Sequence, residues 1–204
     1  MRIGIIGSGM IGGTVGLLLR GTGNDVMFAS RHPDQLVETL GADVRTGTAR
    51  EAAEYGDVLL MSLPLGAIPT LDEDLRAALM GKVVLDTSNP YPQRDGAEAE
   101  AALADPGGSG GWVARQLPGA RIVKAFNTVY FSVLKQRSRP DAPDLGIPIA
   151  GDDADAVGVA ETVVRAAGFE PVVVGKLARS RDFGPGSPVY NQALSPDALR
   201  SALA

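Results

Sequence analysis

The 204-residue chain contains no cysteine and only one histidine, His32. The lack of thiols excludes disulfides, iron–sulfur clusters, thiolate zinc sites and a cysteine nucleophile. A single histidine is too few for the usual multi-histidine metal centres. We therefore predict that the protein holds no metal and that its chemistry uses no cysteine.

Positive charge is also scarce, because 19 lysines and arginines stand against 24 aspartates and glutamates, a formal net charge of −5. Binding to nucleic acid requires clustered basic residues, so we expect no nucleic-acid partner. No apolar run approaches the roughly 20 residues that span a bilayer, and the chain starts with a strand pattern rather than a basic and then apolar leader. We expect no membrane partner and a reducing compartment, most simply the cytoplasm.

Hydrophobic residues make up 45% of the chain, and many of them fall in short runs rich in valine, isoleucine or leucine. Such runs are typical of parallel strands covered on both faces. The runs are Arg2–Ile6, Asp25–Ala29, Val58–Leu63, Lys82–Asp86, Arg121–Ala125, Ile147–Ala150 and Glu170–Val174. Segments with helical spacing separate most of them. The alternation predicts an α/β fold of the Rossmann type, a doubly wound, mostly parallel sheet with a small β-α-β extension at the C-terminus.

We predict a single domain over residues 1–204, with a dinucleotide-binding core at 1–136 and an extension at 137–204 that shapes an acceptor pocket. Two stretches, Pro92–Gly111 and Arg137–Pro148, are rich in proline, glycine and charge, and we interpret both as loops, the first with a short alanine-rich helix. Each is either a solvated connection or the border of a substrate pocket.

The strongest motif directly follows the first predicted strand and opens an amphipathic helix. It reads Gly7, Ser8, Gly9, Met10, Ile11 and Gly12. In this context the first glycine makes a tight turn, the second lets the backbone approach a pyrophosphate, and the third lets the helix pack against the strand. The phosphates would then lie at the positive end of the helix. We assign all six residues to a dinucleotide site; the alternative is a purely structural turn.

The end of the second predicted strand selects between dinucleotides, because an acidic residue there would hold the ribose 2′-hydroxyl of NAD. This sequence has Ser30, Arg31 and His32 at that place. A guanidinium can donate two hydrogen bonds to a 2′-phosphate and the serine hydroxyl can add another, which favours NADP. We include His32 as a cofactor contact, although a solvated histidine explains it equally well.

Small polar side chains follow three further predicted strands, whose ends should surround the nicotinamide if the sheet is parallel. As cofactor contacts we select Leu63, Pro64, Ser88, Asn89 and Pro90, and as catalytic candidates Lys124, Asn127 and Thr128. Helix caps and turns after strands explain any one of them as well. No general acid or base stands in a recognisable catalytic spacing. That suits hydride transfer between two cofactor rings, which depends mainly on orientation.

Taken together, these segments resemble the NADPH-dependent coenzyme F420 reductases and the N-terminal oxidoreductase domain of the STEAP metalloreductases. The resemblance covers about residues 1–180. It rests on the glycine motif, Ser30 to Pro33, Asp86 to Pro90, Val123 to Thr128, Ala150 to Asp153, Gly168 to Pro171 and Gly175 to Ala178. It implies NADP bound by the glycine loop, Ser30 and Arg31, with the nicotinamide near Leu63 and Pro64 and a deazaflavin stacked on it.

Two features depart from these families. The STEAP proteins pass electrons to a membrane haem domain, whereas this sequence has no membrane span. The deazaflavin enzymes end in a longer apolar helix, whereas here an irregular stretch, Arg181 to Tyr190, leads to a brief helix around Pro196–Leu203. Since this tail would help form the acceptor pocket, the difference bears mainly on which acceptor the protein uses.

We predict an NADP-dependent oxidoreductase that exchanges hydride between NADPH and coenzyme F420, and a homodimer. The alternatives are an NADPH-dependent reductase of a flavin, quinone, imine or small carbonyl, and a non-catalytic NADP-binding module that senses redox state. The β-hydroxyacid dehydrogenases and pyrroline-5-carboxylate reductases share the N-terminal pattern, but they complete their sites with a large helical domain. Because only about 55 residues follow Gly151 in this sequence, and much of that stretch is a β-α-β pattern, we do not expect a member of those families.

Overall fold

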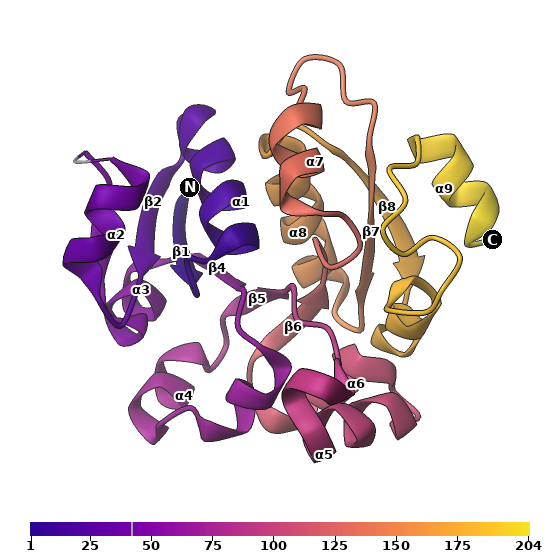
Figure 1. Cartoon of the computed structure of the whole chain (residues 1–204), viewed down its shortest axis with the longest axis horizontal. Helices are drawn as coiled ribbons and strands as arrows, with labels where there is room; N and C mark the ends of the chain where they lie inside the picture. The colour runs from indigo at the N-terminus through magenta and orange to yellow at the C-terminus, as the bar shows by residue number, and fades with distance from the viewer. Residues whose placement is uncertain (42) are drawn as a thin grey trace.

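A computed structural model describes residues 1–41 and 43–204 of the chain. Its centre is a sheet of eight strands in the order β3-β2-β1-β4-β5-β6-β7-β8. The strands are β1 (Arg2–Ile6), β2 (Asp25–Ala29), β3 (Arg45–Gly47), β4 (Val58–Met61), β5 (Val83–Asp86), β6 (Arg121–Lys124), β7 (Gly146–Gly151) and β8 (Glu170–Gly175). This arrangement confirms the predicted Rossmann-type α/β fold (Figure 1).

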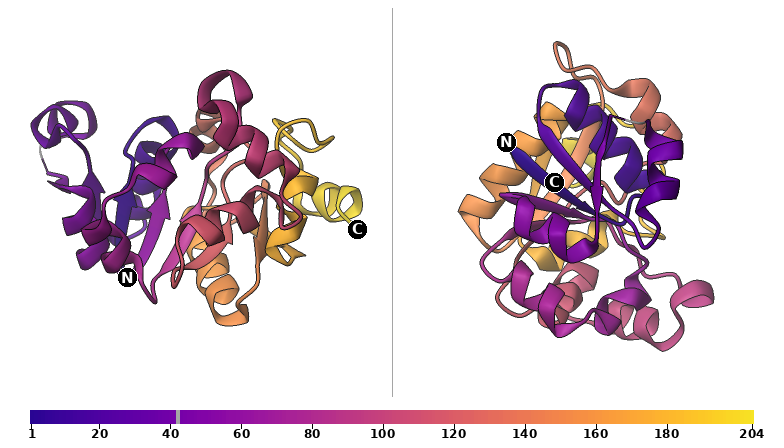
Figure 2. Two further views of the ribbon diagram at one scale, coloured as in Figure 1. Left: turned by 90° about the horizontal axis from the view of Figure 1, so that it is seen from below. Right: turned by 90° about the vertical axis from the view of Figure 1, so that its left-hand side faces the viewer.

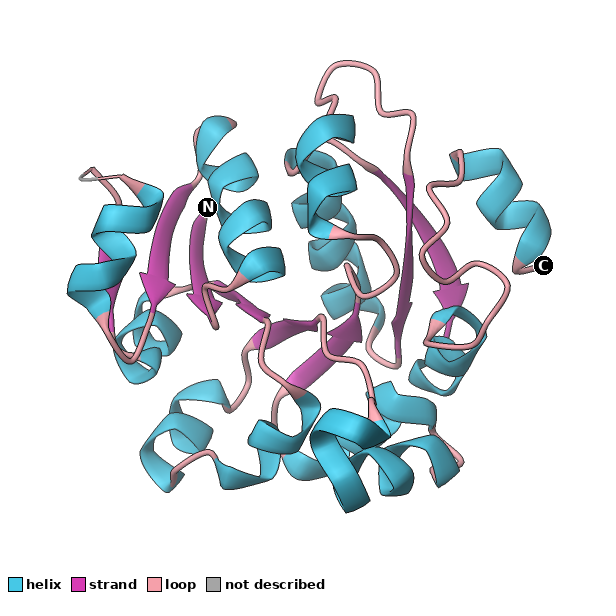
Figure 3. Ribbon diagram, in the orientation of Figure 1, coloured by secondary structure: helices cyan, strands magenta, loops and turns pink. Residues whose placement is uncertain are grey.

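Helices cover both faces of the sheet (Figure 3). The α-helices are α1 (Met10–Gly21), α2 (Pro33–Leu40), α3 (Ala49–Tyr55), α4 (Glu73–Leu79), α5 (Pro92–Ala104), α6 (Gly108–Gln116), α7 (Phe131–Arg137), α8 (Ala154–Ala166) and α9 (Pro196–Ala202), and the two 3₁₀ helices are η1 (Leu65–Thr70) and η2 (Leu177–Phe183). Figure 1 shows α1, α7 and α8 above the sheet and α4, α5 and α6 below it. Among the described residues, no helix combines the length and apolarity needed to cross a bilayer.

The two faces of the sheet carry two hydrophobic cores. Successive strand side chains point to opposite faces, so Ile5 and Leu60 belong to the core under α1 and α8, whereas Ile6 and Leu59 belong to the core over α4 and α6. Because both faces are buried, the strands appear in the sequence as continuous apolar runs.

The direction of the strands determines at which edge of the sheet the connecting loops lie. The strands from β1 to β6 pair in parallel, so β1, β4, β5 and β6 all end at the same edge. Strand β7 pairs antiparallel with β6, and β8 runs parallel to β7. The last β-α-β unit therefore runs opposite to the rest of the sheet, and the chain after it returns beside β7 and β8 (Figure 2).

The stretch Pro92–Gly111 was wrongly predicted as a loop with one short helix. It contains the whole of α5 and the start of α6. The glycines at the start of α6 mark close packing rather than a flexible connection: a Cβ at Gly110 would lie 2.9 Å from the Leu177 side chain and one at Gly108 would lie 2.6 Å from the Ser180 hydroxyl. The prediction for Arg137–Pro148 fits residues 138–145, which lie between α7 and β7.

Candidate functional site

The glycine turn joins β1 to α1. Gly7 has a φ of +92°, and a Cβ there would lie 2.4 Å from the Ser62 carbonyl oxygen, so only glycine fits without a shift. A Cβ at Gly12 would lie 2.1 Å from the carbonyl oxygen of Gly7. The structure thus gives both glycines the local roles predicted for them, a tight turn and close packing of helix against strand.

Gly9 has a different role, because the position of its Cβ is open, with nothing within 4 Å. It is the N-cap of α1 and has no side chain to offer the N–H groups of the first turn. Free N–H groups at the start of a helix, beside open space, suit a pyrophosphate. This part of the site fits a dinucleotide.

The end of β2 is tied to this turn. The Ser8 hydroxyl donates a hydrogen bond to the Ala29 carbonyl at 2.9 Å. Next along the chain, the Ser30 hydroxyl accepts a hydrogen bond from the His32 amide at 3.0 Å. Arg31 and His32 are exposed. The Ser30 proton and the Arg31 guanidinium are therefore both available to a phosphate beside the turn.

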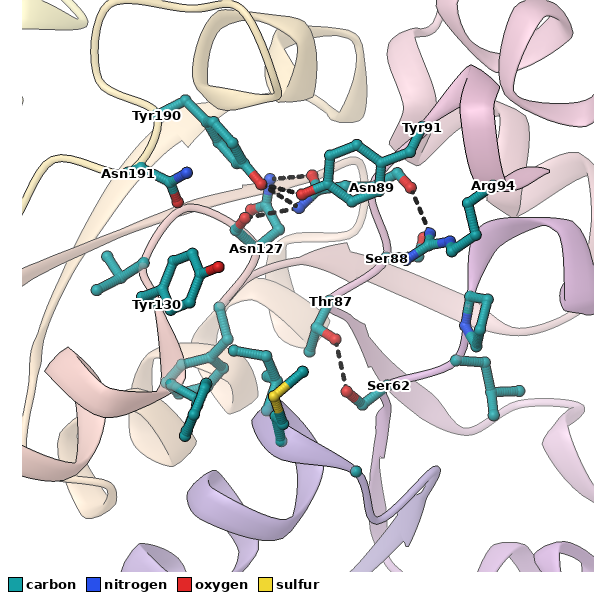
Figure 4. Close-up of a pocket in the computed structure, with 18 residues that line it drawn as sticks. Ser62, Thr87, Ser88, Asn89, Tyr91, Arg94, Asn127, Tyr130, Tyr190 and Asn191 are labelled. Atoms are coloured by element: carbon teal, nitrogen blue, oxygen red, sulfur yellow. Dashed lines mark hydrogen bonds between the residues drawn. The ribbon is translucent and has the colours of Figure 1, made fainter. Parts of the chain in front are cut away.

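A cavity of about 500 Å³ extends from the glycine turn over the ends of β4, β5 and β6 (Figure 4). The predicted site residues that line it are Gly9, Met10, Ile11, Leu63, Pro64, Ser88, Asn89 and Asn127. The lining residues that were not selected from the sequence are Ser62, Thr87, Tyr91, Arg94, Phe126, Val129, Tyr130, Phe131, Tyr190 and Asn191. The predicted site residues outside this lining are Gly7, Ser8, Gly12, Ser30, Arg31, His32, Pro90, Lys124 and Thr128.

A strained turn directs the end of β6 into this cavity. Phe126 has a φ of +57°, which is rare for a non-glycine residue. Its ring is fully buried and packs edge to face on Phe169, with centroids 6.2 Å apart and an interplanar angle of 73°. Core packing therefore holds a costly backbone conformation that presents Asn127 at the pocket.

Asn127 and Asn89 bond each other across the ends of β5 and β6. The Asn127 amide nitrogen donates to Asn89 Oδ1 at 3.1 Å, and Asn89 Nδ2 donates to the Asn127 carbonyl at 2.8 Å. Asn89 Nδ2 also donates to the Tyr190 hydroxyl at 3.3 Å. The pair thus connects the two strand ends with the C-terminal tail.

Lys124, which was predicted as a catalytic residue, lies buried in an ion pair outside the pocket lining. Its side chain is 0% exposed, and its Nζ lies 2.8 Å from Oδ2 of Asp86, which is also 0% exposed. The same ammonium donates to the Ser88 carbonyl, and the Ser88 amide donates to Asp86 Oδ1 at 2.9 Å. The lysine therefore holds the end of β5 in place and does not face the pocket.

Thr128 is likewise buried outside the lining, and its carbonyl accepts a hydrogen bond from the Asn191 amide at 2.8 Å. Asn191 has a φ of +58°. This contact fixes the tail that carries Tyr190 and Asn191 against the end of β6. The buried Oγ1 of Thr128 has no hydrogen-bond partner among the described residues.

The far end of the pocket is aromatic, and the Arg94 guanidinium, which also lines the pocket, lies 4.8 Å from the centroid of the Tyr91 ring. The hydroxyls of Tyr91 and Tyr190 form a hydrogen bond, and Tyr130 is 60% exposed beside them. Burial and the bond to Tyr91 raise the pKa of Tyr190 well above its ordinary value of 10. Nearer the glycine turn, the Thr87 hydroxyl donates to the Ser62 hydroxyl at 3.0 Å, which leaves the Ser62 proton for a ligand.

Comparison with known proteins adds to this geometry. Residues 2–90 match the model of a family described as NADP oxidoreductase coenzyme F420-dependent. Metalloreductase STEAP3 of Rattus norvegicus is 26% identical over 181 residues, which cover 89% of this chain but only 35% of that protein. The F420-dependent NADP reductase of Methanocaldococcus jannaschii is 28% identical over 196 residues, which cover 89% of this chain and 86% of that one.

Among solved structures, a protein of Arthrobacter sp. FB24 provisionally named an F420-dependent NADP-reductase has the same fold. Its TM-score is 0.74 at 22% sequence identity, with 89% of this chain and 87% of that chain covered. The resemblance to the F420-dependent NADP oxidoreductases that the sequence motifs predicted is therefore confirmed.

Proposed function

We propose that this protein is an NADP-dependent oxidoreductase that transfers a hydride between NADPH and the deazaflavin coenzyme F420. The observation that carries the proposal is the continuous pocket, which starts at the glycine turn and ends at Tyr91 and Tyr190. Such a pocket has a phosphate-binding end and an aromatic end for a planar acceptor. The F420-dependent reductase of Methanocaldococcus jannaschii, similar over 89% of this chain, supports the choice of acceptor.

Each end of the dinucleotide has candidate partners. The first-turn N–H groups beside Gly9 would hold the pyrophosphate, and Arg31 with Ser30 would hold the 2′-phosphate. When bound, NADPH would supply the hydride. Leu63 and Pro64, which line the pocket where β4 ends, would pack against the nicotinamide and keep water from it.

The C-terminal segment 137–204 is part of this proposal as the wall of the acceptor pocket. Tyr190 and Asn191 line the far end, and the Asn191 amide is bonded to the end of β6. The core 1–136 contributes the remaining walls. The acceptor would thus lie between two parts of one domain, which would orient it.

The direct test mixes the protein with NADPH and oxidised F420 and follows both absorbance spectra. We expect NADPH and F420 absorbance to fall together in equal molar amounts. Turnover of a flavin, quinone, imine or small carbonyl in place of F420 would support a different reductase. Tight NADPH binding with no turnover of any of these acceptors would contradict the enzyme and favour a redox-sensing module.

We also propose that the protein acts as a homodimer in the cytoplasm. A second copy would add cover to the pocket, which a short C-terminal segment only partly encloses. Light scattering after size-exclusion chromatography measures the molar mass, and a mass of one chain would contradict the dimer.

A further inference from the structure

Two tyrosine hydroxyls meet at the far end of the pocket. Tyr91 precedes α5, and Tyr190 belongs to the C-terminal tail 99 positions later in the sequence. Both line the pocket, both are half-buried, and their hydroxyls are bonded to each other. Figure 4 shows them grouped with Asn89 and Asn127, on the opposite side of the pocket from Ser62.

One hydroxyl proton of this tyrosine pair is not used in a hydrogen bond between the two residues. Two phenols have two O–H groups, and their mutual bond uses one of them. Asn89 Nδ2 faces the Tyr190 oxygen at 3.3 Å, and an amide nitrogen can only donate. Among the described residues, the structure gives these two hydroxyls no other partner. One O–H of the pair is therefore free to point into the pocket.

The neighbouring bonds fix which atom of Asn89 faces Tyr190. Its Oδ1 accepts from the Asn127 amide nitrogen at 3.1 Å, and its Nδ2 donates to the Asn127 carbonyl at 2.8 Å. A reversed amide would lose both bonds and set donor against donor. The Tyr190 oxygen therefore accepts a hydrogen bond from Asn89 Nδ2. The O–H group that is not used between the two tyrosines cannot donate to Asn89 and points elsewhere.

Tyr190 keeps its proton at neutral pH. Burial and the bond to Tyr91 raise the pKa of Tyr190, which makes the phenol a poor acid but a persistent hydrogen-bond donor. A neutral hydroxyl can stabilise negative charge as it forms on the acceptor by donating a hydrogen bond to it.

We infer that the free O–H of the Tyr91–Tyr190 pair donates a hydrogen bond to the acceptor, at a carbonyl oxygen or ring nitrogen conjugated to the carbon that receives the hydride. The inference rests on the proposed function and specifies how the acceptor is recognised. The hydride brings two electrons to that carbon, and the displaced electron pair moves onto the heteroatom. A proton from solvent completes the reduction, and the tyrosines are unchanged.

Three variants test this inference: Tyr91→Phe, Tyr190→Phe and the double variant. Each single variant keeps one hydroxyl that can still donate to the acceptor, whereas the double variant keeps none. We expect each single variant to slow single-turnover hydride transfer to F420 by less than about tenfold, and the double variant to slow it by about 10²–10³-fold, as for loss of a transition-state donor.

A purely structural bond predicts the opposite pattern. If the two hydroxyls only tied the tail to the core, either substitution would break the same bond, and the double variant would equal each single one. We expect that pattern in the unfolding midpoint but not in the transfer rate. Binding of oxidised F420 to the NADP⁺-loaded protein, measured by fluorescence, should weaken most in the double variant.

Tyr55→Phe is the matched control, because Tyr55 ends α3 and its ring lies under the Arg45 guanidinium, away from the pocket. It should not change transfer or F420 binding. A double variant as fast and as tight-binding as either single one would overturn the inference and leave the proposed function standing. A wild-type protein that neither binds nor reduces F420 would overturn both.

Discussion

The Lys124 ammonium and the Asp86 carboxylate lie 2.8 Å apart on neighbouring strands, and neither side chain is exposed to solvent. They are also direct partners in the register of β5 and β6. A buried charge is costly unless it is paired and hydrogen-bonded, and this pair also bonds the backbone of Ser88 on both sides. The pair thus fixes the end of β5 just before the pocket.

Lys124→Met should therefore act on stability, because it leaves Asp86 buried without its partner. We expect a loss of about 3–5 kcal/mol in the free energy of unfolding, measured by urea denaturation. Adding Asp86→Asn to Lys124→Met removes the unpaired charge and should recover part of that loss. The exposed Arg50, which pairs with Glu54 and Asp74, is the control, since Arg50→Met should cost only about 1 kcal/mol.

The same variant separates the two roles of Lys124. If Lys124→Met unfolds as the wild type does but loses hydride transfer, the lysine acts in the chemistry, as the sequence alone suggested. If stability falls and the folded fraction still transfers hydride, the lysine is a structural residue.

Gly9 offers a test of the phosphate site without a folding defect. Its φ of −75° is accessible to any residue and its Cβ position is open, so Gly9→Ala should change the free energy of unfolding by no more than about 1 kcal/mol. The added methyl group would occupy the space proposed for the pyrophosphate. We expect at least about tenfold weaker NADPH binding in a fluorescence titration, a cost of about 1.4 kcal/mol.

Two other glycines of α1 provide comparison variants for Gly9→Ala. Gly21→Ala, at the end of the helix where the Cβ position is also open, should leave NADPH binding unchanged. Gly12→Ala should destabilise the fold, because its methyl group would collide with the Gly7 carbonyl. Unchanged NADPH binding in Gly9→Ala would show that the pyrophosphate lies elsewhere.

The glycine turn and the polar strand ends could be predicted because each depends on a local pattern. A strand, a glycine motif and an amphipathic helix stand in sequence, and parallel strands then bring their ends together. The burial of Lys124 could not be predicted, because it depends on a partner on the neighbouring strand. Strands at known register would have paired it with Asp86, but the sequence gives no register.

The aromatic end of the pocket required long-range information. Tyr190 reaches the site because β7 runs antiparallel to β6 and the tail then returns to the end of β6, bonded through Asn191. Nothing in the Gly-Pro-Gly-Ser-Pro segment before it indicates that destination. The glycines at the start of α6 led to the wrong prediction of a loop for a related reason. Their small size allows close packing against η2, and no local sequence pattern indicates that packing.

Arg31→Ala tests the choice of dinucleotide. Loss of a charge-assisted hydrogen bond to the 2′-phosphate should cost about 1.5–3 kcal/mol, which weakens NADPH binding by about 10- to 150-fold. NADH has no 2′-phosphate, so its dissociation constant is the internal control and should hardly change. Equal losses for NADPH and NADH would show that Arg31 does not contact the 2′-phosphate.

Asn127→Ala tests the polar network at the end of β6. The substitution removes the donor to Asn89 Oδ1 and leaves only the Asn127 backbone carbonyl to hold the Asn89 amide, which loosens the amide that bonds Tyr190. We expect hydride transfer to fall by about 10²-fold, because small misplacements of reacting groups have effects of that size. NADPH affinity should be largely kept, since the phosphate contacts proposed at Gly9 and Arg31 are not involved.

Single-turnover kinetics and an NADPH titration on the same preparation measure both effects. Asn24→Ala is the matched control, because Asn24 bonds the Leu19 carbonyl at the other end of α1. It should leave both quantities unchanged. Full transfer activity in Asn127→Ala would remove Asn127 from the site, and a parallel loss of NADPH affinity would place it at the dinucleotide rather than at the acceptor.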